Sequence, residues 1–461
     1  MYNSDTIAAI ATGMTNSGIG IIRISGSESF AVAERIFLPA NKNIKIKDAE
    51  SHTIHYGFIK DGEETVDEAM VSVMKSPRSF TTEDTVEINC HGGMLVMNRI
   101  LQLVITNGAR LAEPGEFTKR AFLNGRIDLS EAEAVMDVIS SKNDMALKSS
   151  VGQLRGKVSE KVKQLRSDII YEIAFIESAL DDPEHISLDD YPDKLLIKTD
   201  FLIKAVDNLL QSADSGRIMK EGIKTVIVGK PNAGKSSLLN ILAGEEKAIV
   251  TDIAGTTRDV LEENINLHGI SLNVIDTAGI RDTEDTVEKI GVERARKAAM
   301  DADLIIYVVD ASVPLDGNDQ MIFEMIHDKK SVILLNKTDL SSVINEDDLL
   351  EMTGKDSVMI RTSTKDATGI DLFENTVKDM FFKGKINPDQ EVVITNMRHK
   401  EALLRTLESL KQVKQSIENH MPEDFYSIDL MSAYTSLGSI IGEEVSDDLV
   451  NEIFSKFCMG K

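Results

Sequence analysis

The sequence predicts a multidomain protein: an α+β N-terminal domain, an all-α helical domain, and an α/β P-loop domain inserted into the helical one. Three observations predict this class. Strand-like apolar runs alternate with helical patterns over the first 120 residues. The apolar spacing then changes to alternating threes and fours, as in amphipathic helices. From residue 222, a glycine-rich loop opens a series of buried-strand patterns, each followed by loop and helix signals.

The N-terminal residues 1–120 are expected to form a compact α+β domain, because their strand-like runs are bounded by Gly, Pro, Asp and Ser. The expected strands are Thr6–Thr12, Gly20–Ser25, His52–Ile59, Ala69–Met74 and Val86–Cys90. Helices are expected at Ser27–Phe37 and Met94–Asn107.

From about residue 130 the pattern is helical. Apolar residues from Val151 to Leu180 predict one long amphipathic helix, which Asp181-Asp182-Pro183 should end. A second helix is expected at roughly Pro192–Ala213, and helical stripes return after residue 384. The economical arrangement is one helical domain made of residues 121–221 and 384–461, with residues 222–383 inserted between them. Two separate helical units would give the same pattern.

Composition limits the classes of function. A net charge of −25 and a pI near 4.8 argue against a broad basic surface for nucleic acid. Cys90 and Cys458 lie far apart, which argues against a disulfide framework and a zinc site and fits a reducing cytosol. No apolar run approaches the roughly 18–20 residues of a membrane span, and no signal or transit peptide is visible. A cytoplasmic protein with no membrane partner is therefore expected.

Residues 229–236 read Gly-Lys-Pro-Asn-Ala-Gly-Lys-Ser, the pattern of a phosphate-binding loop. Its backbone N–H groups and the N-terminus of the following helix would surround the phosphates. Lys235 would reach the β and γ phosphates, and the Ser236 hydroxyl would bind Mg²⁺. The stretch Asp276-Thr277-Ala278-Gly279 should supply a carboxylate for a magnesium-bound water and an N–H that senses the γ-phosphate.

The base is predicted to be guanine. Asn336-Lys337-Thr338-Asp339 follows an apolar strand pattern, and Ser363-Thr364-Lys365 completes the set. The Asp339 carboxylate can accept from guanine N1–H and from the exocyclic amine, whereas adenine offers neither donor there. The inserted part is therefore predicted to be a Ras-like α/β P-loop GTPase domain with GTP as its substrate.

The motifs do not identify the residue that orients the attacking water. Ile280 stands where Ras-type enzymes carry the glutamine that orients the attacking water. Residues 281–288 offer several acidic or hydroxyl candidates, and residue chemistry alone does not choose among them. Arg258 and Arg281 could act as arginine fingers, but the Asn232 side chain could instead hold a monovalent cation against the phosphates. The matching segment is Thr251–Asp259, in which Thr257 is a natural Mg²⁺ ligand.

These motifs, with the closing Phe457-Cys458-Met459-Gly460-Lys461, resemble the MnmE (TrmE) family of bacterial tRNA-modification GTPases along the whole chain. The resemblance also includes Asp5–Ala8, Gly20–Gly26, His91–Gly93, Pro114–Phe117 and Leu123–Leu129. Two residues depart from the expected pattern. Met459 replaces isoleucine, which nearly conserves volume. Arg126 stands where lysine also occurs, so the charge remains but the donor geometry differs.

The resemblance implies a specific activity. Members of the family pair with an FAD-dependent protein, MnmG, as a heterotetramer. Together they install an aminomethyl-type group, such as carboxymethylaminomethyl, at C5 of the wobble uridine of certain tRNAs. A tetrahydrofolate derivative of the 5-formyl or methylene type carries the one-carbon unit. The N-terminal domain binds the folate and forms a homodimer, and the G domains meet across the dimer in a K⁺-dependent way that activates hydrolysis.

The resemblance also implies residue roles. K⁺ would be held by Asn232, Thr251, Ile253 and Thr256, and Mg²⁺ by Ser236 and Thr257. Glu288 would orient the attacking water, and Lys235 is a second catalytic residue. Cys458 is a candidate nucleophile or part of the folate site. Folate contacts are expected from Arg23, Glu87, Arg126 and Lys461. The predicted nucleotide-binding set is Asn232, Ala233, Gly234, Lys235, Ser236, Ser237, Thr251, Asp252, Ile253, Ala254, Gly255, Thr256, Thr257, Asp276, Thr277, Ala278, Gly279, Asn336, Lys337, Asp339, Ser363 and Thr364.

Plainer interpretations exist for the folate residues. Glu87 alone would fit a carboxylate on an edge strand, Arg23 an outward-facing strand charge, and Cys458 a buried small hydrophobe. Together, a carboxylate and cations suit a pterin–glutamate ligand, because the carboxylate pairs with pterin N–H donors and the cations with the glutamate tail. The competing class is a regulatory or ribosome-assembly GTPase, in which this set and the cysteine tail have no role. The charge of −25 predicts weak tRNA binding by the protein alone.

Overall fold

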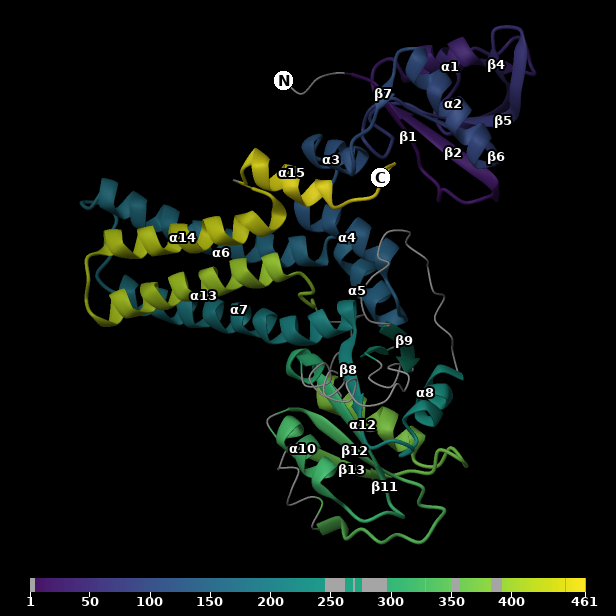
Figure 1. Ribbon diagram of the computed structural model, residues 1–461. Helices are drawn as coiled ribbons and strands as arrows, with labels where there is room; N and C mark the ends of the chain where they lie inside the picture. The colour runs from purple at the N-terminus through teal and green to yellow at the C-terminus, as the bar shows by residue number, and fades with distance from the viewer. Residues whose placement is uncertain are drawn as a thin grey trace. The chain divides into compact units, whose positions relative to one another are not determined.

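The computed structural model describes residues 5–244, 262–267, 270–275, 297–327, 329–347, 349, 357–382, 392–443 and 445–460. The chain divides into two compact units (Figure 1). The first consists of Met1–Met136 and Leu437–Lys461, and the second of Asp137–Ser436. The first unit contains a mixed sheet with helices, and the second contains a helical part and an α/β part. These components match the predicted multidomain fold class.

A seven-stranded sheet forms the centre of the first unit, in the order β3-β4-β5-β6-β2-β1-β7. Neighbouring strands are antiparallel except for the parallel pair β1 and β7. The five expected strands are present, and the sequence analysis missed the short β3 and β7. The strands are β1 (Ile7–Ile10), β2 (Ser17–Ser25), β3 (Phe37–Pro39), β4 (Thr53–Asp61), β5 (Glu64–Met74), β6 (Thr85–Gly92) and β7 (Arg110–Leu111).

Two helices, α1 (Ser29–Ile36) and α2 (Met94–Thr106), cover one face of this sheet, as their apolar patterns predict. That face supplies Ile22, Ile88 and Val71, which lie in register on β2, β6 and β5 and are fully buried. Side chains alternate along a strand, so the intervening residues belong to the opposite face. The residues that alternate with this core therefore line a second face, which carries polar and exposed apolar groups.

Helices α3 (Glu116–Leu123), α4 (Leu129–Ser140) and α15 (Asp447–Ser455) also belong wholly or mainly to the first unit, together with the short helix η1 (Ile46–Asp48). The start of α4 and the end of the chain share a small apolar cluster, in which Leu129 and Ala132 pack with Phe454 and Phe457. Helix α15 also packs on α3. Helix α15 and Phe457 are thereby packed against the N-terminal part of the chain.

The second unit begins with helices α5 (Asp144–Leu154), α6 (Lys157–Asp181) and α7 (Tyr191–Glu221). The prediction of one helix across Val151–Leu180 is wrong, because the chain breaks between α5 and α6. Gly156 lies there at φ +86°, a left-handed conformation that does not continue a helix. The apolar spacing runs through the break, so periodicity alone does not reveal it. The predicted end at Asp181 is confirmed.

Helices α13 (Met397–Glu418) and α14 (Glu423–Ile441) complete the helical part (Figure 1). Lys400 pairs with Asp214 and Lys414 with Asp200, each at 2.7 Å, so α13 runs antiparallel to α7. The Arg166 guanidinium of α6 lies 3.9 Å from the centre of the Tyr434 ring on α14. Helices that precede and follow the α/β part in sequence therefore pack against one another.

The α/β part of the second unit contains a six-stranded sheet in the order β13-β12-β11-β8-β10-β9. All neighbours are parallel except β9 and β10. The sequence predicts a strand at Thr225–Val228 and buried parallel strands at Leu272–Ile275, Leu304–Val309 and Val332–Leu335, and all four are present. The edge strands β9 and β13 were not predicted. The strands are β8 (Ile223–Val228), β9 (Glu262–Leu267), β10 (Ile270–Ile275), β11 (Leu304–Asp310), β12 (Ser331–Asn336) and β13 (Ser357–Arg361); the helices are α8 (Lys235–Gly244), α10 (Gly317–Ile326) and α12 (Ile370–Phe382).

None of the helices in the described parts of the chain has the length and apolar character that crossing a membrane requires.

Candidate functional site

The predicted phosphate loop connects the end of β8 to the start of α8. Its first residue, Gly229, has a φ of +151°, and a Cβ there would lie 2.4 Å from the Val308 carbonyl oxygen. Asn232 adopts a φ of +61°, which asparagine tolerates better than most residues. Gly234 has a φ of +108°, and a Cβ there would lie 2.1 Å from Asn336 Nδ2. Close packing on β11 and on Asn336 thus requires both glycines.

Helix α8 begins at Lys235, directly after this loop. The Lys235 ammonium donates to the carbonyl oxygens of Gly229 and Lys230 at 2.7 and 2.8 Å, so it lies across the loop. Ser236 and Ser237 are exposed in the first turn, while Leu238 is fully buried and anchors the helix. Because the first N–H groups of a helix have no intrahelical partner, this end of α8 can bind phosphate oxygens.

Asn336, at the end of β12, connects two of the predicted nucleotide elements. It is fully buried, and its Nδ2 donates to the Ala233 carbonyl oxygen at 2.8 Å and to Thr364 Oγ1 at 3.3 Å. The Thr364 backbone N–H donates in turn to Asn336 Oδ1 at 3.0 Å. The amide side chain therefore holds the phosphate loop and the 363–364 segment together.

Asp339, the predicted base-contacting residue, and Lys337, another predicted nucleotide-binding residue, are also held in place. Ser363 Oγ donates to Asp339 Oδ1 at 3.3 Å. The Lys337 ammonium donates to Asp310 Oδ2, at the end of β11, at 2.6 Å. Partial burial alone would raise the pKa of Asp310, but hydrogen bonds from Lys337 and Ser312 outweigh it and lower the pKa. A charged Asp310 thus fixes Lys337.

Several predicted site residues lie outside the described residues, so their predicted roles stay predictions. These are Thr251, Asp252, Ile253, Ala254, Gly255, Thr256, Thr257, Asp276, Thr277, Ala278, Gly279, Glu288 and Lys461, and the same holds for Arg258, Ile280 and Arg281.

Two of the predicted folate residues, Arg23 and Glu87, meet on the second face of the seven-stranded sheet. Arg23 of β2 and Glu87 of β6 are cross-strand partners, and Arg23 Nε donates to Glu87 Oε1 at 2.8 Å. Their side chains retain 17% and 21% of their exposure, so ligand could still reach them. Glu87 does not lie on an edge strand, because β6 has β5 and β2 as neighbours. The plain edge-strand interpretation is therefore wrong.

Arg126 joins this pair through an aromatic ring. Its guanidinium carbon lies 4.9 Å from the centre of the half-buried Phe80 ring, and its Nη1 donates to the Phe80 carbonyl oxygen at 2.7 Å. The Arg23 guanidinium lies 5.8 Å from the same ring and 5.7 Å from the ring of the buried Phe117. Two cations thus lie beside one aromatic ring, at distances typical of cation–π contacts.

The C-terminal segment reaches the same place. Arg23 Nη1 donates to the Gly460 carbonyl oxygen at 3.2 Å. Gly460 has a φ of +86°, and a Cβ there would lie 2.3 Å from the Ile10 carbonyl oxygen. The Gly115 N–H donates to the Cys458 carbonyl oxygen at 3.3 Å, and the Cys458 thiol is exposed. The interpretation of Cys458 as a buried small hydrophobe is therefore wrong.

Two protein-family models match this chain, and together they cover most of its length. A family model described as GTP-binding protein TrmE N-terminus matches residues 6–126, and a model of the MnmE helical domain matches residues 129–458. The chain belongs to the MnmE family of tRNA modification GTPases.

Similar relatives within the MnmE family match almost the whole chain. The tRNA modification GTPase MnmE of Lachnoclostridium phytofermentans is 57% identical over 99% of this chain and 100% of its own length. Those of Acetivibrio thermocellus and Listeria welshimeri are 50% and 48% identical, covering 100% and 99% of each chain respectively. Among solved structures, the chain is similar to the G domain of the T. maritima FeoB iron transporter, at 25% identity, 34% coverage of this chain, 97% of that one, and a TM-score of 0.26.

Two aromatic residues of this MnmE-family chain, Phe80 and Phe117, were not predicted as site residues. Phe117 belongs to the Pro114–Phe117 motif, but that motif gives no reason to assign its ring to the site. Phe80 lies in the segment between β5 and β6, where no periodicity marks it. Only the fold brings these rings to Arg23.

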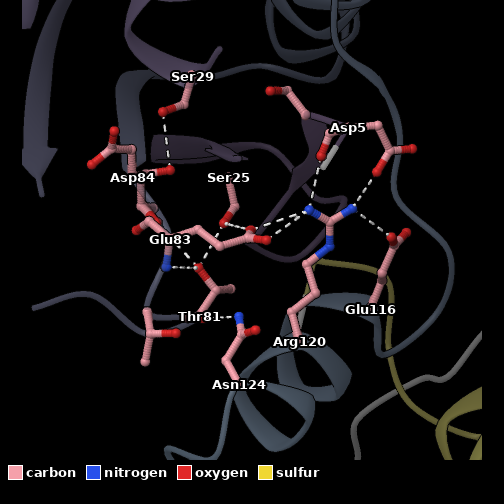
Figure 2. A network of polar contacts seen from close by, with 12 residues as sticks. Asp5, Ser25, Ser29, Thr81, Glu83, Asp84, Glu116, Arg120 and Asn124 are labelled. Atoms are coloured by element: carbon pink, nitrogen blue, oxygen red, sulfur yellow. Dashed lines mark hydrogen bonds and ion pairs between the residues drawn. The ribbon is translucent and has the colours of Figure 1, made fainter. Parts of the chain in front are cut away.

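A buried polar network fixes the segment that carries Phe80 (Figure 2). At its centre, Arg120 of α3 donates to Glu83 at 3.1 Å, to Glu116 at 2.9 Å and to Asp5 at 2.8 Å. Thr81, two residues before Glu83, makes further contacts with Asn124 and Ser25. The Thr81 carbonyl oxygen accepts from Asn124, and Ser25 Oγ bonds to both Thr81 Oγ1 and Glu83 Oε2. The residues that follow Phe80 are thus held by Ser25 of β2, by Arg120 of α3 and by Asn124 at the end of that helix.

Charge pairing keeps this network ionised. Burial alone would raise the pKa of Glu116, but hydrogen bonds from Arg110, from the Glu113 backbone and from Arg120 outweigh it and lower the pKa. Conversely, burial opposes the charge on Arg120, whereas Glu83 and Glu116 raise its pKa. Glu116 and Arg120 are therefore both charged at neutral pH, and removing one of them would leave the other as a buried charge without this partner.

Proposed function

We propose that this protein is a K⁺-dependent GTPase that works with an FAD-dependent MnmG-type partner. The pair would add an aminomethyl-type group, such as carboxymethylaminomethyl, to C5 of the wobble uridine of certain tRNAs, with a tetrahydrofolate derivative as the one-carbon source. Membership of the MnmE family supports the GTPase and tRNA-modification parts. The single observation that supports the folate part is the convergence of Arg23, Glu87 and Arg126 around Phe80.

The chemistry of that cluster fits a folate. A pterin is flat and aromatic, and it can stack on the half-buried Phe80 ring. Its N–H donors suit the Glu87 carboxylate, and the acidic tail of the ligand suits Arg126 and Lys461. A regulatory or ribosome-assembly GTPase, the alternative proposal, would need no such cluster of charged and aromatic groups on its N-terminal sheet.

The nucleotide site fits hydrolysis of GTP with two cations. The exposed Ser236 hydroxyl in the first turn of α8 would hold Mg²⁺, with Thr257 as a further ligand, and Mg²⁺ would neutralise charge that develops on the phosphates. Asn232 is exposed in the loop and would supply a side-chain oxygen to K⁺, together with Thr251, Ile253 and Thr256. Lys235 would bind the β and γ phosphates, and Glu288 would orient the attacking water.

A homodimer is the proposed assembly, and the second face of the seven-stranded sheet supports it. On this face Arg23, Glu87, Ser72 and Ile54 form one row across four strands. In that row and the adjacent one, Ile54 is 64% exposed and Tyr56 and Met70 are 47% and 46% exposed. Contiguous exposed apolar groups of this kind mark interaction surfaces. A second copy on this face would adjoin the proposed folate site.

The proposal also divides the remaining tasks. A net charge of −25 supports weak tRNA affinity for this protein alone, with the partner supplying most phosphate contacts. The exposed Cys458 thiol, whose backbone is held beside the Arg23 site, supports a role for this residue in modification or in folate binding. A cytoplasmic location is part of the same proposal.

Calorimetric titration of the full-length protein with 5-formyltetrahydrofolate tests the folate site. Wild-type protein should bind, and Glu87→Gln should weaken binding by about tenfold or more, because a neutral amide replaces a charged hydrogen-bond acceptor. Arg99→Met is the matched control, since Arg99 pairs with Glu64 at the surface. A wild-type protein that binds no reduced folate would favour the alternative GTPase class.

Analysis of wobble uridine in tRNA tests the cellular function. Cells that lack the gene should accumulate unmodified wobble uridine, and the wild-type gene should restore the modification. The K⁺ requirement is tested by comparing GTP turnover in KCl and NaCl at equal ionic strength. Equal rates in the two salts would contradict the role proposed for Asn232.

A further inference from the structure

Lys230 is the second residue of the phosphate loop, at a position that the generic motif leaves open. Its ammonium group lies 2.6 Å from Asp319 Oδ2 and 3.0 Å from Asp316 Oδ2, at the start of α10. It also donates to the Pro314 carbonyl oxygen at 3.3 Å. With 18% of the side chain exposed, this lysine connects the loop to α10 through a largely buried contact.

The acceptor of this lysine is itself fixed. Asp319 is 1% exposed, and its Oδ1 accepts from the hydroxyl of the fully buried Tyr307 on β11 at 2.6 Å. Its Oδ2 accepts from the Asp316 N–H at 2.7 Å, which forms part of the capping box that begins α10. Asp319 is thus held by the central strand β11 and by the N-terminus of α10.

The electrostatics agree with a fixed ion pair. Partial burial opposes the charge on Lys230, but its hydrogen bonds to Asp319 and Asp316 outweigh this and raise its pKa. The pKa of Asp316 is lowered, chiefly by its hydrogen bond with Lys230. Burial and the hydrogen bond to Asp319 raise the pKa of Tyr307, so its hydroxyl remains a donor. Lys230 is therefore charged and held at neutral pH.

Contacts with neighbouring elements hold the loop on both sides of Asn232. On the C-terminal side, the Ala233 carbonyl oxygen accepts from the buried Asn336 side chain at 2.8 Å. On the N-terminal side lies Lys230 with its carboxylates. Asn232 between them has a φ of +61°, a conformation that costs free energy and persists only where the surroundings enforce it. The loop can bind phosphate oxygens only while its N–H groups converge, so its curvature matters for affinity.

We propose that Lys230 is a positioning residue of the nucleotide site, which sets the curvature of the phosphate loop before nucleotide binds by tying the loop to Asp319 and Asp316. The inference rests on the proposed binding of guanine nucleotide to this loop. It assigns to Lys230 a role that differs from that of Lys235, because Lys230 acts through its carboxylate partners and not by contact with phosphate.

The test measures binding of a fluorescent GDP analogue to full-length variants. Lys230→Met should raise the dissociation constant by about tenfold, mainly through faster dissociation, because the loop must be ordered on binding. Lys230→Arg should stay within about threefold of wild type, since a guanidinium can reach both carboxylates. Lys224→Met, an exposed lysine on β8, is the matched control and should change nothing. Hydrolysis of GTP already bound, measured in a single turnover, should change less than the dissociation constant.

A double-mutant cycle with Asp319→Asn identifies the route of the effect. If Lys230 acts through Asp319, the double variant should bind nucleotide no more weakly than the worse single variant. Additive losses, or a Lys230→Met variant that binds like wild type while only its melting temperature falls, would overturn the proposal. If Asp319→Asn does not fold, Asp316→Asn replaces it, since that side chain is 52% exposed, and the same non-additivity with Lys230→Met is expected. A wild-type protein that binds no guanine nucleotide would instead contradict the proposed function.

Discussion

The nucleotide site lies where parallel strands end, and its described groups come from three short segments that each follow a strand. The site on the seven-stranded sheet instead collects Arg23, Phe80, Glu87, Arg126 and Gly460, which are spread over nearly the whole chain. In the first site backbone geometry and glycines shape the ligand surface, whereas in the second side chains do so. Substitutions in the first site should therefore change nucleotide binding directly. Substitutions in the second site should also change ligand binding indirectly, by altering the stability of the fold that brings its residues together.

The largest expected effect is a change of base preference from Asp339→Asn. The carboxylate would accept two guanine N–H donors, and an amide replaces one acceptor by a donor. Preference for GTP should fall on the order of 1,000-fold relative to xanthosine triphosphate, because a mismatched site leaves buried polar groups unpaired. Competition of the two nucleotides in a hydrolysis assay measures it. A variant that still prefers GTP would show that the base is recognised elsewhere.

Removing the centre of the polar network should damage the second site through stability. Arg120→Met leaves Glu83 and Glu116 without their shared cation, and Glu116 is 7% exposed. We expect a loss of about 3 kcal/mol in the free energy of unfolding of the first unit. Urea unfolding followed by a probe in residues 1–136 checks this, with Arg99→Met as the surface control. A loss no larger than that of the control would show that the Arg120 network does not stabilise the first unit.

The same network predicts a pH dependence. The pKa of Glu116 is lowered in the folded chain, so its charged form stabilises the fold at pH values above its unfolded pKa of about 4.3. This contribution should disappear as pH falls through that value toward the lowered folded pKa. Arg120→Met should weaken the pH dependence in this window. Parallel unfolding curves for both proteins between neutral and acidic pH provide the measurement.

A smaller effect is expected from Phe80→Leu, which keeps an apolar group but removes the ring between two guanidinium groups. Affinity for a reduced folate should fall about fivefold to tenfold, in line with the loss of an aromatic contact. Phe80→Tyr should bind nearly as wild type does. Titration with 5-formyltetrahydrofolate measures the folate affinity of both variants. If Phe80→Leu and wild type bind the folate equally well, the ligand does not stack on the Phe80 ring.

The smallest effect should come from Met459→Ile. Met459 is 56% exposed, and the change nearly conserves volume. Folate affinity and melting temperature should stay within about twofold and about one degree of wild type, respectively. A large change in either quantity would mean that the identity of this residue, and not only the backbone of the tail, shapes the site.

The two sites also differ in how far the sequence predicts them. The nucleotide residues could be assigned because each motif is contiguous and its chemistry follows from its spacing, as with Asn336 and Asp339. Lys230 was overlooked because its partners, Asp316 and Asp319, are more than 80 residues away and belong to no motif. The folate residues were found by resemblance alone, and Phe80 could not be found because cross-strand register and the Arg120 network bring it into place.

Strands with alternating apolar and polar residues, or with continuous apolar runs, were predicted, whereas the edge strands β3, β7, β9 and β13 were not. A strand such as β7, with two residues, carries too little pattern to identify. The break at Gly156 was missed for a different reason, since helices on both sides present apolar residues at a compatible spacing. Such breaks depend on a single backbone conformation, which hydrophobic periodicity does not record.

The close approach of Gly216 on α7 to the segment before α13 has an evolutionary consequence. A Cβ on Gly216 would lie 2.1 Å from the Ile394 carbonyl oxygen, so the chain leaves the helical part near residue 221 and returns to it beside the same helix. A module whose two ends lie so close can be gained, lost or exchanged without rebuilding its host. A short linker in place of residues 222–391 should therefore leave the α7–α13 pair able to form, and a different switch could be grafted at the same junction.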